Sequence, residues 1–135
     1  MSSAIHAAGL WTGLCILLLL VLSGLTSANR RKHKVSIGDG GKAEVAAASR
    51  AFGNAAEYMP IALIGLALMA LTGFSPVWIH AVGASFFLGR VLHACGMFVT
   101  REGRPPAVQR MAGMLLTYFP LLGAAGALIW CFFCH

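Results

Sequence analysis

Three ionisable residues, Arg50, Glu57 and Arg90, lie inside segments of this chain that are otherwise apolar. Charged groups are costly in hydrocarbon, so they normally face the interior of a helical bundle and mark a functional path or pocket. At 3.6 residues per turn, Asn54 shares a helix face with Arg50 and Glu57, and His93 shares one with Arg90. The spacing therefore predicts a polar pocket in which the two arginines donate hydrogen bonds and Glu57 is the one carboxylate.

The balance of charge in this pocket allows two interpretations. In the first, Glu57 and Arg90 only neutralise each other and hold the bundle together, because buried ions need partners wherever they occur. In the second, two arginines against one carboxylate leave a surplus of positive charge. That surplus makes an anionic ligand the leading hypothesis.

The elements that carry these residues are predicted from composition and hydropathy. The 135-residue chain is 59% hydrophobic and 10% charged, with a mean hydropathy of +0.80, whereas soluble domains carry roughly 25% charged residues. The net charge of +6 does not indicate nucleic-acid binding, because such proteins are polar as well as basic. Since a span needs about 20 apolar residues, we expect an all-α integral membrane protein. It forms a single domain over 1–135, with four transmembrane helices at about 5–25, 46–71, 77–99 and 111–133.

The basic residues predict the orientation of these spans. The charges between spans gather in and beside loops 30–42 and 100–110, which lie on the same side of a four-span protein. The positive-inside rule makes that side cytoplasmic and places both termini outside. No Lys or Arg precedes the first apolar run, so we expect a retained span there and not a signal peptide. Three tryptophans map to the outer helix ends and are expected to anchor the interface: Trp11, Trp78 and Trp130.

Two segments resemble motifs of the MAPEG family, the membrane-associated proteins in eicosanoid and glutathione metabolism. Segment 50–60, RAFGNAAEYMP, resembles the family's R-x3-N-x2-E-Y-x-P signature, and segment 89–96, GRVLHACG, resembles its third-helix motif. The glycine-rich loop 38–41 resembles the bacterial branch. The resemblance implies a homotrimer of four-helix subunits that bind glutathione at subunit interfaces near the cytoplasmic face. Many members conjugate the sulfur of glutathione to lipophilic electrophiles.

Glutathione carries two carboxylates, an ammonium group and a thiol. A site for it needs guanidinium groups, an acidic partner for the amine and a cation near the sulfur. By resemblance, Glu57 is expected to face the γ-glutamyl amine. Arg30 matches a basic position of the family and is a candidate to hold a carboxylate, although a solvated cytoplasmic anchor explains it equally well. The glutathione contacts that the resemblance implies are Arg30, Arg50, Asn54, Glu57, Tyr58, Arg90 and His93.

The catalytic step of the family relies on an arginine at the cytoplasmic start of the fourth helix. Free cysteine has a pKa of about 8.5 and the thiolate is the nucleophile, so a nearby cation raises its population at neutral pH. Arg110 directly precedes the fourth apolar run and is the predicted catalytic residue, with Arg104 and Arg101 as alternatives. Met97 stands where several eukaryotic members place a tyrosine, so the contact from that tyrosine is expected to be missing.

No metal, haem or disulfide is expected. The cysteines within spans do not resemble the disulfide framework of a small secreted domain. Segment 131–135, CFFCH, matches the C-x-x-C-H haem pattern, but it lies in an apolar helix with no surroundings to enclose a porphyrin. The histidines outside the pocket lack a second ligand at metal spacing.

The leading functional hypothesis is a microsomal-type glutathione S-transferase, a transferase or peroxidase of the bacterial inner membrane. Its expected partners are glutathione as co-substrate, a small lipophilic electrophile, membrane lipids and further copies of the chain, with no nucleic acid. The alternative is a non-catalytic MAPEG-like membrane protein with an anionic ligand site. A small multidrug exporter also uses a membrane glutamate, but a path for cationic drugs would avoid the arginines.

Overall fold

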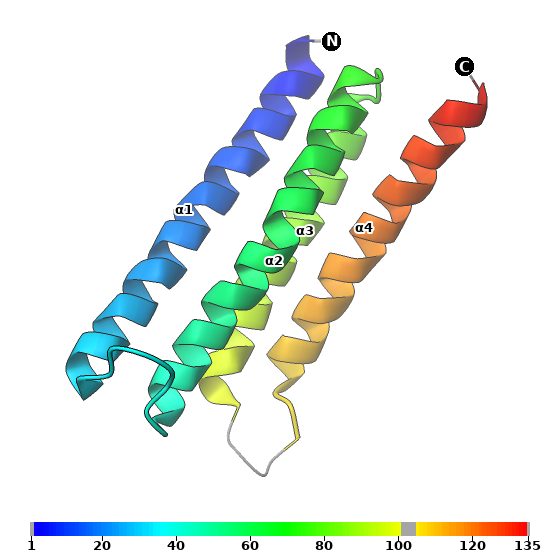
Figure 1. Ribbon diagram of the computed structural model, residues 1–135. Helices are drawn as coiled ribbons and strands as arrows, with labels where there is room; N and C mark the ends of the chain where they lie inside the picture. The colour runs from blue at the N-terminus through cyan, green and yellow to red at the C-terminus, as the bar shows by residue number, and fades with distance from the viewer. Residues whose placement is uncertain (1, 101–104, 135) are drawn as a thin grey trace.

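Four long helices make up the part of the chain that the structure describes (Figure 1). The structure is a computed structural model and describes residues 2–100 and 105–134. Each helix is long and apolar enough to cross a membrane. The predicted all-α class with four membrane-length helices is therefore confirmed. The helices are α1 (Ser2–His33), α2 (Ala43–Leu71), α3 (Pro76–Val99) and α4 (Val108–Cys134).

The helices extend beyond the spans predicted from hydropathy. The first span is predicted to end near residue 25, whereas α1 continues to His33. Hydropathy detects only the apolar part of a helix, and the backbone hydrogen bonds of α1 continue through its polar end. The last turn of α1 carries Arg30, Arg31 and Lys32, and cations there interact favourably with the unpaired carbonyls of the helix end. Likewise α4 begins at Val108, which places Arg110 inside its first turn.

The start of α1 and the end of α4 lie at one end of the bundle, and residues 34–42, the end of α3 and the start of α4 lie at the other (Figure 1). We call these the terminal end and the basic end; the basic end carries residues 34–42, the end of α3 and the start of α4. At the terminal end, a short turn at residues 72–75 joins α2 to α3. The alternative catalytic candidates Arg101 and Arg104 lie outside the described residues.

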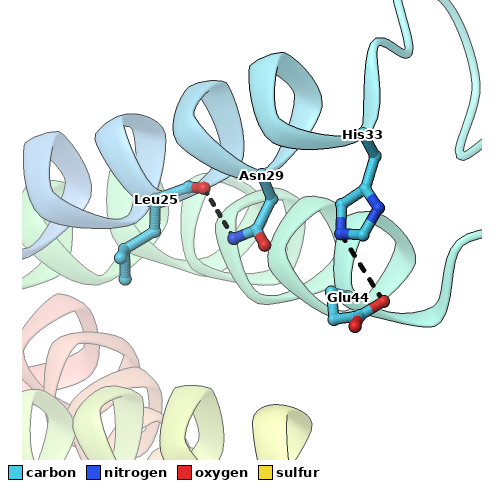
Figure 2. Close-up of polar contacts among 4 residues, drawn as sticks. All are labelled: Leu25, Asn29, His33 and Glu44. Atoms are coloured by element: carbon cyan, nitrogen blue, oxygen red, sulfur yellow. Dashed lines mark hydrogen bonds and ion pairs between the residues drawn. The ribbon is translucent and has the colours of Figure 1, made fainter.

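At the basic end, the last residue of α1 lies close to the first turn of α2 (Figure 2). His33 Nε2 lies 3.8 Å from a carboxylate oxygen of Glu44. Asn29 Nδ2 donates to the carbonyl of Leu25, one turn earlier in α1, at 2.9 Å.

Trp11 packs α1 against α3. Its indole Nε1 donates to His80 Nδ1 at 3.1 Å, and a Cβ on Gly83 would lie 2.8 Å from the same indole nitrogen. The absence of a side chain at Gly83 therefore makes room for the ring. Trp78 and Trp130 are 62% and 69% exposed, and their role as interfacial anchors stays a prediction.

Glycines allow α3 and α4 to approach closely. A Cβ on Gly89 of α3 would lie 2.9 Å from the carbonyl oxygen of Gly113 in α4. A Cβ on Gly96 would lie 2.7 Å from the Cα of Arg110. Small residues let helix backbones approach in membranes, where packing and not the hydrophobic effect drives helix association. The first turns of α4 are therefore held against the last turns of α3.

Candidate ligand-binding site

An open cavity of about 320 Å³ lies between α2, α3 and α4 toward the basic end. Helix α2 lines one side through residues spaced three and four apart, because such residues share one helix face. The last turns of α3 and the first turns of α4 form the other side. The residues that line it are Ser49, Arg50, Gly53, Asn54 and Glu57 of α2, His93 and Met97 of α3, and Arg110 and Met114 of α4.

The cavity brings together most of the site residues predicted from the sequence. Arg50, Asn54 and Glu57 line it from α2, as their shared helix face predicts. His93 and Arg110 complete it from α3 and α4. Arg50 and Glu57 are exposed on the single chain. Their side chains are therefore available to a ligand or to another subunit.

Arg90 lies behind the cavity and does not line it. Its side chain is only 2% exposed. Its Nε and Nη2 donate to Thr117 Oγ1 at 3.0 and 2.6 Å, and its Nη1 donates to the side-chain oxygen of Asn54. The guanidinium carbon also lies 5.1 Å from the centre of the Tyr58 ring, a distance at which the ring attracts a cation. Arg90 thus orients Asn54, and Asn54 presents the rest of its amide to the cavity.

The Glu57–Arg90 ion pair that the sequence left open is not formed within the described part of the chain. The groups that accept hydrogen bonds from Arg90 are the neutral oxygens of Asn54 and Thr117. Glu57 is exposed and lines the cavity instead. Because neutral acceptors leave the charge of Arg90 in place, the region around the cavity keeps a surplus of positive charge.

Two other predicted contacts lie outside the cavity in the single chain. Tyr58 places its hydroxyl 3.1 Å from that of Tyr118, so the two phenols join α2 to α4. Arg30 donates through Nη1 to the backbone carbonyl of Ser36 at 3.1 Å and thereby binds the end of α1 to the connection that follows it. In the single chain both residues have structural contacts.

Sequence reasoning missed Thr117 and Ser49. Thr117 is fully buried and also donates to the Gly113 carbonyl at 2.8 Å. Thr117 lies seven residues after Arg110 and therefore on the same face of α4. Because a buried arginine on the facing helix needs a hydrogen-bond acceptor, this spacing could have predicted Thr117 as a partner of Arg90. The Ser49 hydroxyl is buried, lines the cavity and has no hydrogen-bond partner among the described residues. No signal in the sequence separates Ser49 from an ordinary helix serine.

A second hollow of about 430 Å³ adjoins the cavity on the side of the basic end. The two share Arg50 and Met97, so the cavity continues toward the connection between α1 and α2. Asp39, Lys42 and Thr100 line the far part of this hollow. The two hollows therefore adjoin each other at Arg50 and Met97.

Comparison with known proteins identifies the family. A sequence model of the MAPEG family matches residues 8–130. The chain belongs to the MAPEG family. Two relatives, both named "Inner membrane protein YecN", come from Escherichia coli strain K12 and from Escherichia coli O6:H1 strain CFT073. Each is 35% identical over 121 residues, which cover 90% of this chain and 88% of the relative.

No solved structure matches this MAPEG chain. The matched residues include the whole cavity and the buried Arg90 and Thr117 behind it. The membership that segments 50–60 and 89–96 suggested is thus confirmed. Among the described residues, Cys15, Cys95 and Cys131 are free, and no cluster of His, Cys, Asp and Glu could hold a metal ion.

Proposed function

We propose that this MAPEG protein is a glutathione-dependent transferase or peroxidase that acts on lipophilic electrophiles. One observation carries the proposal: α2 and α4 place Arg50, Glu57 and Arg110 around a single cavity. A carboxylate together with separated guanidinium groups suits a ligand that has an ammonium group, carboxylates and an ionisable thiol. In this proposal Glu57 binds the γ-glutamyl amine, and Arg50 binds a carboxylate.

Arg110 has the catalytic role in this proposal. A cation beside the sulfur lowers the pKa of the bound thiol and raises the population of the nucleophilic thiolate. In conjugation the sulfur supplies the electron pair of the new C–S bond, and the leaving group or epoxide oxygen takes the pair from the bond that breaks. In the peroxidase reaction two glutathione molecules are oxidised to the disulfide while a hydroperoxide is reduced to an alcohol and water. Neither reaction needs a nucleophilic side chain.

We further propose that the functional unit is a homotrimer, as family membership implies. The face of α2 that carries Glu57 continues toward the terminal end with an exposed apolar stripe: Ile61, Ile64, Leu68 and Leu71. Their spacing of four and three is the pattern by which helices pack in coiled coils. Packing of this face against other copies would also cover Arg50 and Glu57, which are costly next to lipid. Tyr58 and Arg30 then become candidates for ligand contacts contributed at the subunit interface.

The proposed location is the bacterial inner membrane, with the basic end in the cytoplasm and both termini outside. The relatives are named as inner membrane proteins, and basic residues collect at one end of the bundle. The electrophile would reach the cavity from the bilayer, and glutathione would enter from the cytoplasm through the hollow at the basic end.

Calorimetric titration of the purified full chain in detergent tests this function. Glutathione and S-hexylglutathione should both bind, and the absorbance of bound glutathione across pH should show a thiol pKa below its free value. In Arg110→Ala the pKa should return toward the free value and conjugation at neutral pH should slow, with the dissociation constant changed much less. Binding without a lowered pKa or turnover would favour the non-catalytic alternative. Absence of binding would contradict the proposal.

A further inference from the structure

Gly96 of α3 lies directly against the backbone of Arg110. A Cβ built on Gly96 would lie 2.7 Å from both the Cα and the Cβ of Arg110, and closer still to its backbone nitrogen. Contacts this short do not occur between real atoms, and helix backbone cannot rotate aside as the end of a flexible side chain can. The missing side chain of Gly96 therefore sets how closely the start of α4 approaches α3.

A second contact of this kind lies one turn further along α4, where a glycine of α4 meets the backbone of α3. A Cβ on Gly113 would lie 2.8 Å from the Cα of His93, and closer still to its backbone nitrogen. Each glycine therefore meets the backbone of a residue whose side chain lines the cavity. The width of the cavity between α3 and α4 depends on both glycines.

One long hydrogen bond joins the same two helix ends. Thr100 Oγ1 donates to the carbonyl of Gly96 at 2.6 Å and accepts from the backbone N–H of Ala107 at 3.4 Å. The backbone N–H of Arg110 in turn donates to the Ala107 carbonyl at 2.9 Å. The close approach at Gly96 and this hydrogen bond therefore both act on the start of α4.

We propose that Gly96 is a positioning residue for Arg110, which it holds where the guanidinium reaches the sulfur of the bound thiol. A methyl group at position 96 displaces the first turn of α4 and carries Arg110 away from the cavity. Misplacement by about 1 Å can reduce a rate by as much as 10²-fold. The assignment of the thiol rests on the proposed function, whereas the placement of Arg110 rests on the helix contact alone.

The test uses Gly96→Ala and Gly113→Ala, with Gly126→Ala as the matched control. Gly126 lies in α4, is exposed and has nothing within 4 Å of a built Cβ. In both test variants the pKa of bound glutathione should rise toward the value found in Arg110→Ala, and conjugation should slow, while the dissociation constant changes little. The control should behave as the parent protein. Parent values in both test variants would overturn the proposal.

A double-mutant cycle separates positioning from general damage to the bundle. If Gly96 acts through Arg110, then Gly96→Ala should cause no further loss of rate in an Arg110→Ala background. If the two losses instead multiply, Gly96 acts elsewhere and the proposal is wrong. Failure of both Gly96→Ala and Gly113→Ala to assemble would also overturn it, because the contact would then stabilise the whole bundle.

A measurement without glutathione keeps this inference distinct from the proposed function. Arg110→Cys is made in a chain whose four native cysteines are replaced by alanine, and its rate of reaction with a water-soluble methanethiosulfonate is measured. Gly96→Ala should change this rate severalfold, and Gly126→Ala should leave it unchanged. Should the parent protein bind no glutathione, this rate alone decides the inference. An equal rate with and without Gly96→Ala would refute it.

Discussion

At the scale of single residues, Arg90 shows how a buried charge can be satisfied without a carboxylate. Its donors go to the hydroxyl of Thr117 and the amide oxygen of Asn54, and its guanidinium carbon lies over the Tyr58 ring. Neutral partners satisfy the hydrogen bonds but do not cancel the charge. The guanidinium therefore adds positive potential to the cavity from behind, where it cannot itself contact a ligand in the single chain.

Thr117→Val should destabilise the protein, because the near-isosteric side chain leaves two donors of Arg90 without an acceptor. Hydrogen bonds to charged groups contribute about 1.5–3 kcal/mol, and we expect a loss in this range. Unfolding in detergent, followed by circular dichroism, measures it. Thr117→Ser retains the hydroxyl and should stay close to the parent. A valine variant as stable as the parent would show that Arg90 finds another partner.

Glu57→Gln should weaken glutathione binding more than tenfold without unfolding the protein. The amide keeps the shape of the carboxylate but loses the charge that pairs with the ligand amine, and a charged hydrogen bond contributes about 1.5–3 kcal/mol. Calorimetric titration with glutathione measures the change. Glu44→Gln is the control, because Glu44 is an exposed carboxylate at the start of the same helix and outside the cavity. Normal binding by Glu57→Gln would remove this residue from the site.

At the scale of elements, small residues decide where the helices meet. Gly89, Gly96 and Gly113 bring the backbones of α3 and α4 together, and Gly83 accommodates the Trp11 ring between α1 and α3. These contacts act on backbone or on a large rigid ring, so a single added methyl group cannot be absorbed by a flexible side chain. Close contacts of this kind transmit the position of one helix to the next.

Gly83→Ala should therefore destabilise the packing of α1 on α3. The new methyl group would overlap the Trp11 indole, which its hydrogen bond to His80 holds in place. Overpacking of this kind typically costs about 1–3 kcal/mol. Thermal unfolding compared with Gly9→Ala gives the measurement, since nothing lies within 4 Å of a Cβ on Gly9 of α1. Equal stability of the two variants would mean that the indole moves aside freely.

At the scale of the whole molecule, the bundle is polarised along its length. Basic residues of α1 and the cavity lie toward one end. Both termini lie at the other end (Figure 1). The exposed stripe of α2 runs from the cavity toward the terminal end. This arrangement fits a subunit whose polar site opens to an aqueous compartment and whose apolar length is covered by lipid and by other copies.

Reporter fusions test the orientation that follows from this polarity. A reporter active only in the cytoplasm should be active when inserted at Gly40 and inactive when fused after His135, because basic loops are retained in the cytoplasm. A reporter active only outside the cytoplasm should give the opposite pattern at the two positions. Cytoplasmic activity at the C-terminal fusion would reverse the proposed topology.

The sequence by itself determined the number and class of the helices and the residues of one helix face. Apolar runs of membrane length predict helices because an unpaired backbone is too costly in lipid. The spacing of Arg50, Asn54 and Glu57 predicts their common face because the helical period is fixed. The lining of one cavity by Arg110 and these residues was expected from family resemblance, and the fold brings them together.

Tertiary structure alone decided which groups satisfy Arg90, where Trp11 packs and how closely α3 approaches α4. Each depends on contacts between helices far apart in the sequence, and helical periodicity carries no information about which faces meet. The sequence left open whether Glu57 is the counter-ion of Arg90, and packing gives Arg90 the neutral oxygens of Thr117 and Asn54 and leaves Glu57 in the cavity. In the sequence, nothing distinguishes Gly96 from other helix glycines. Only the structure shows that it lies against the backbone of Arg110.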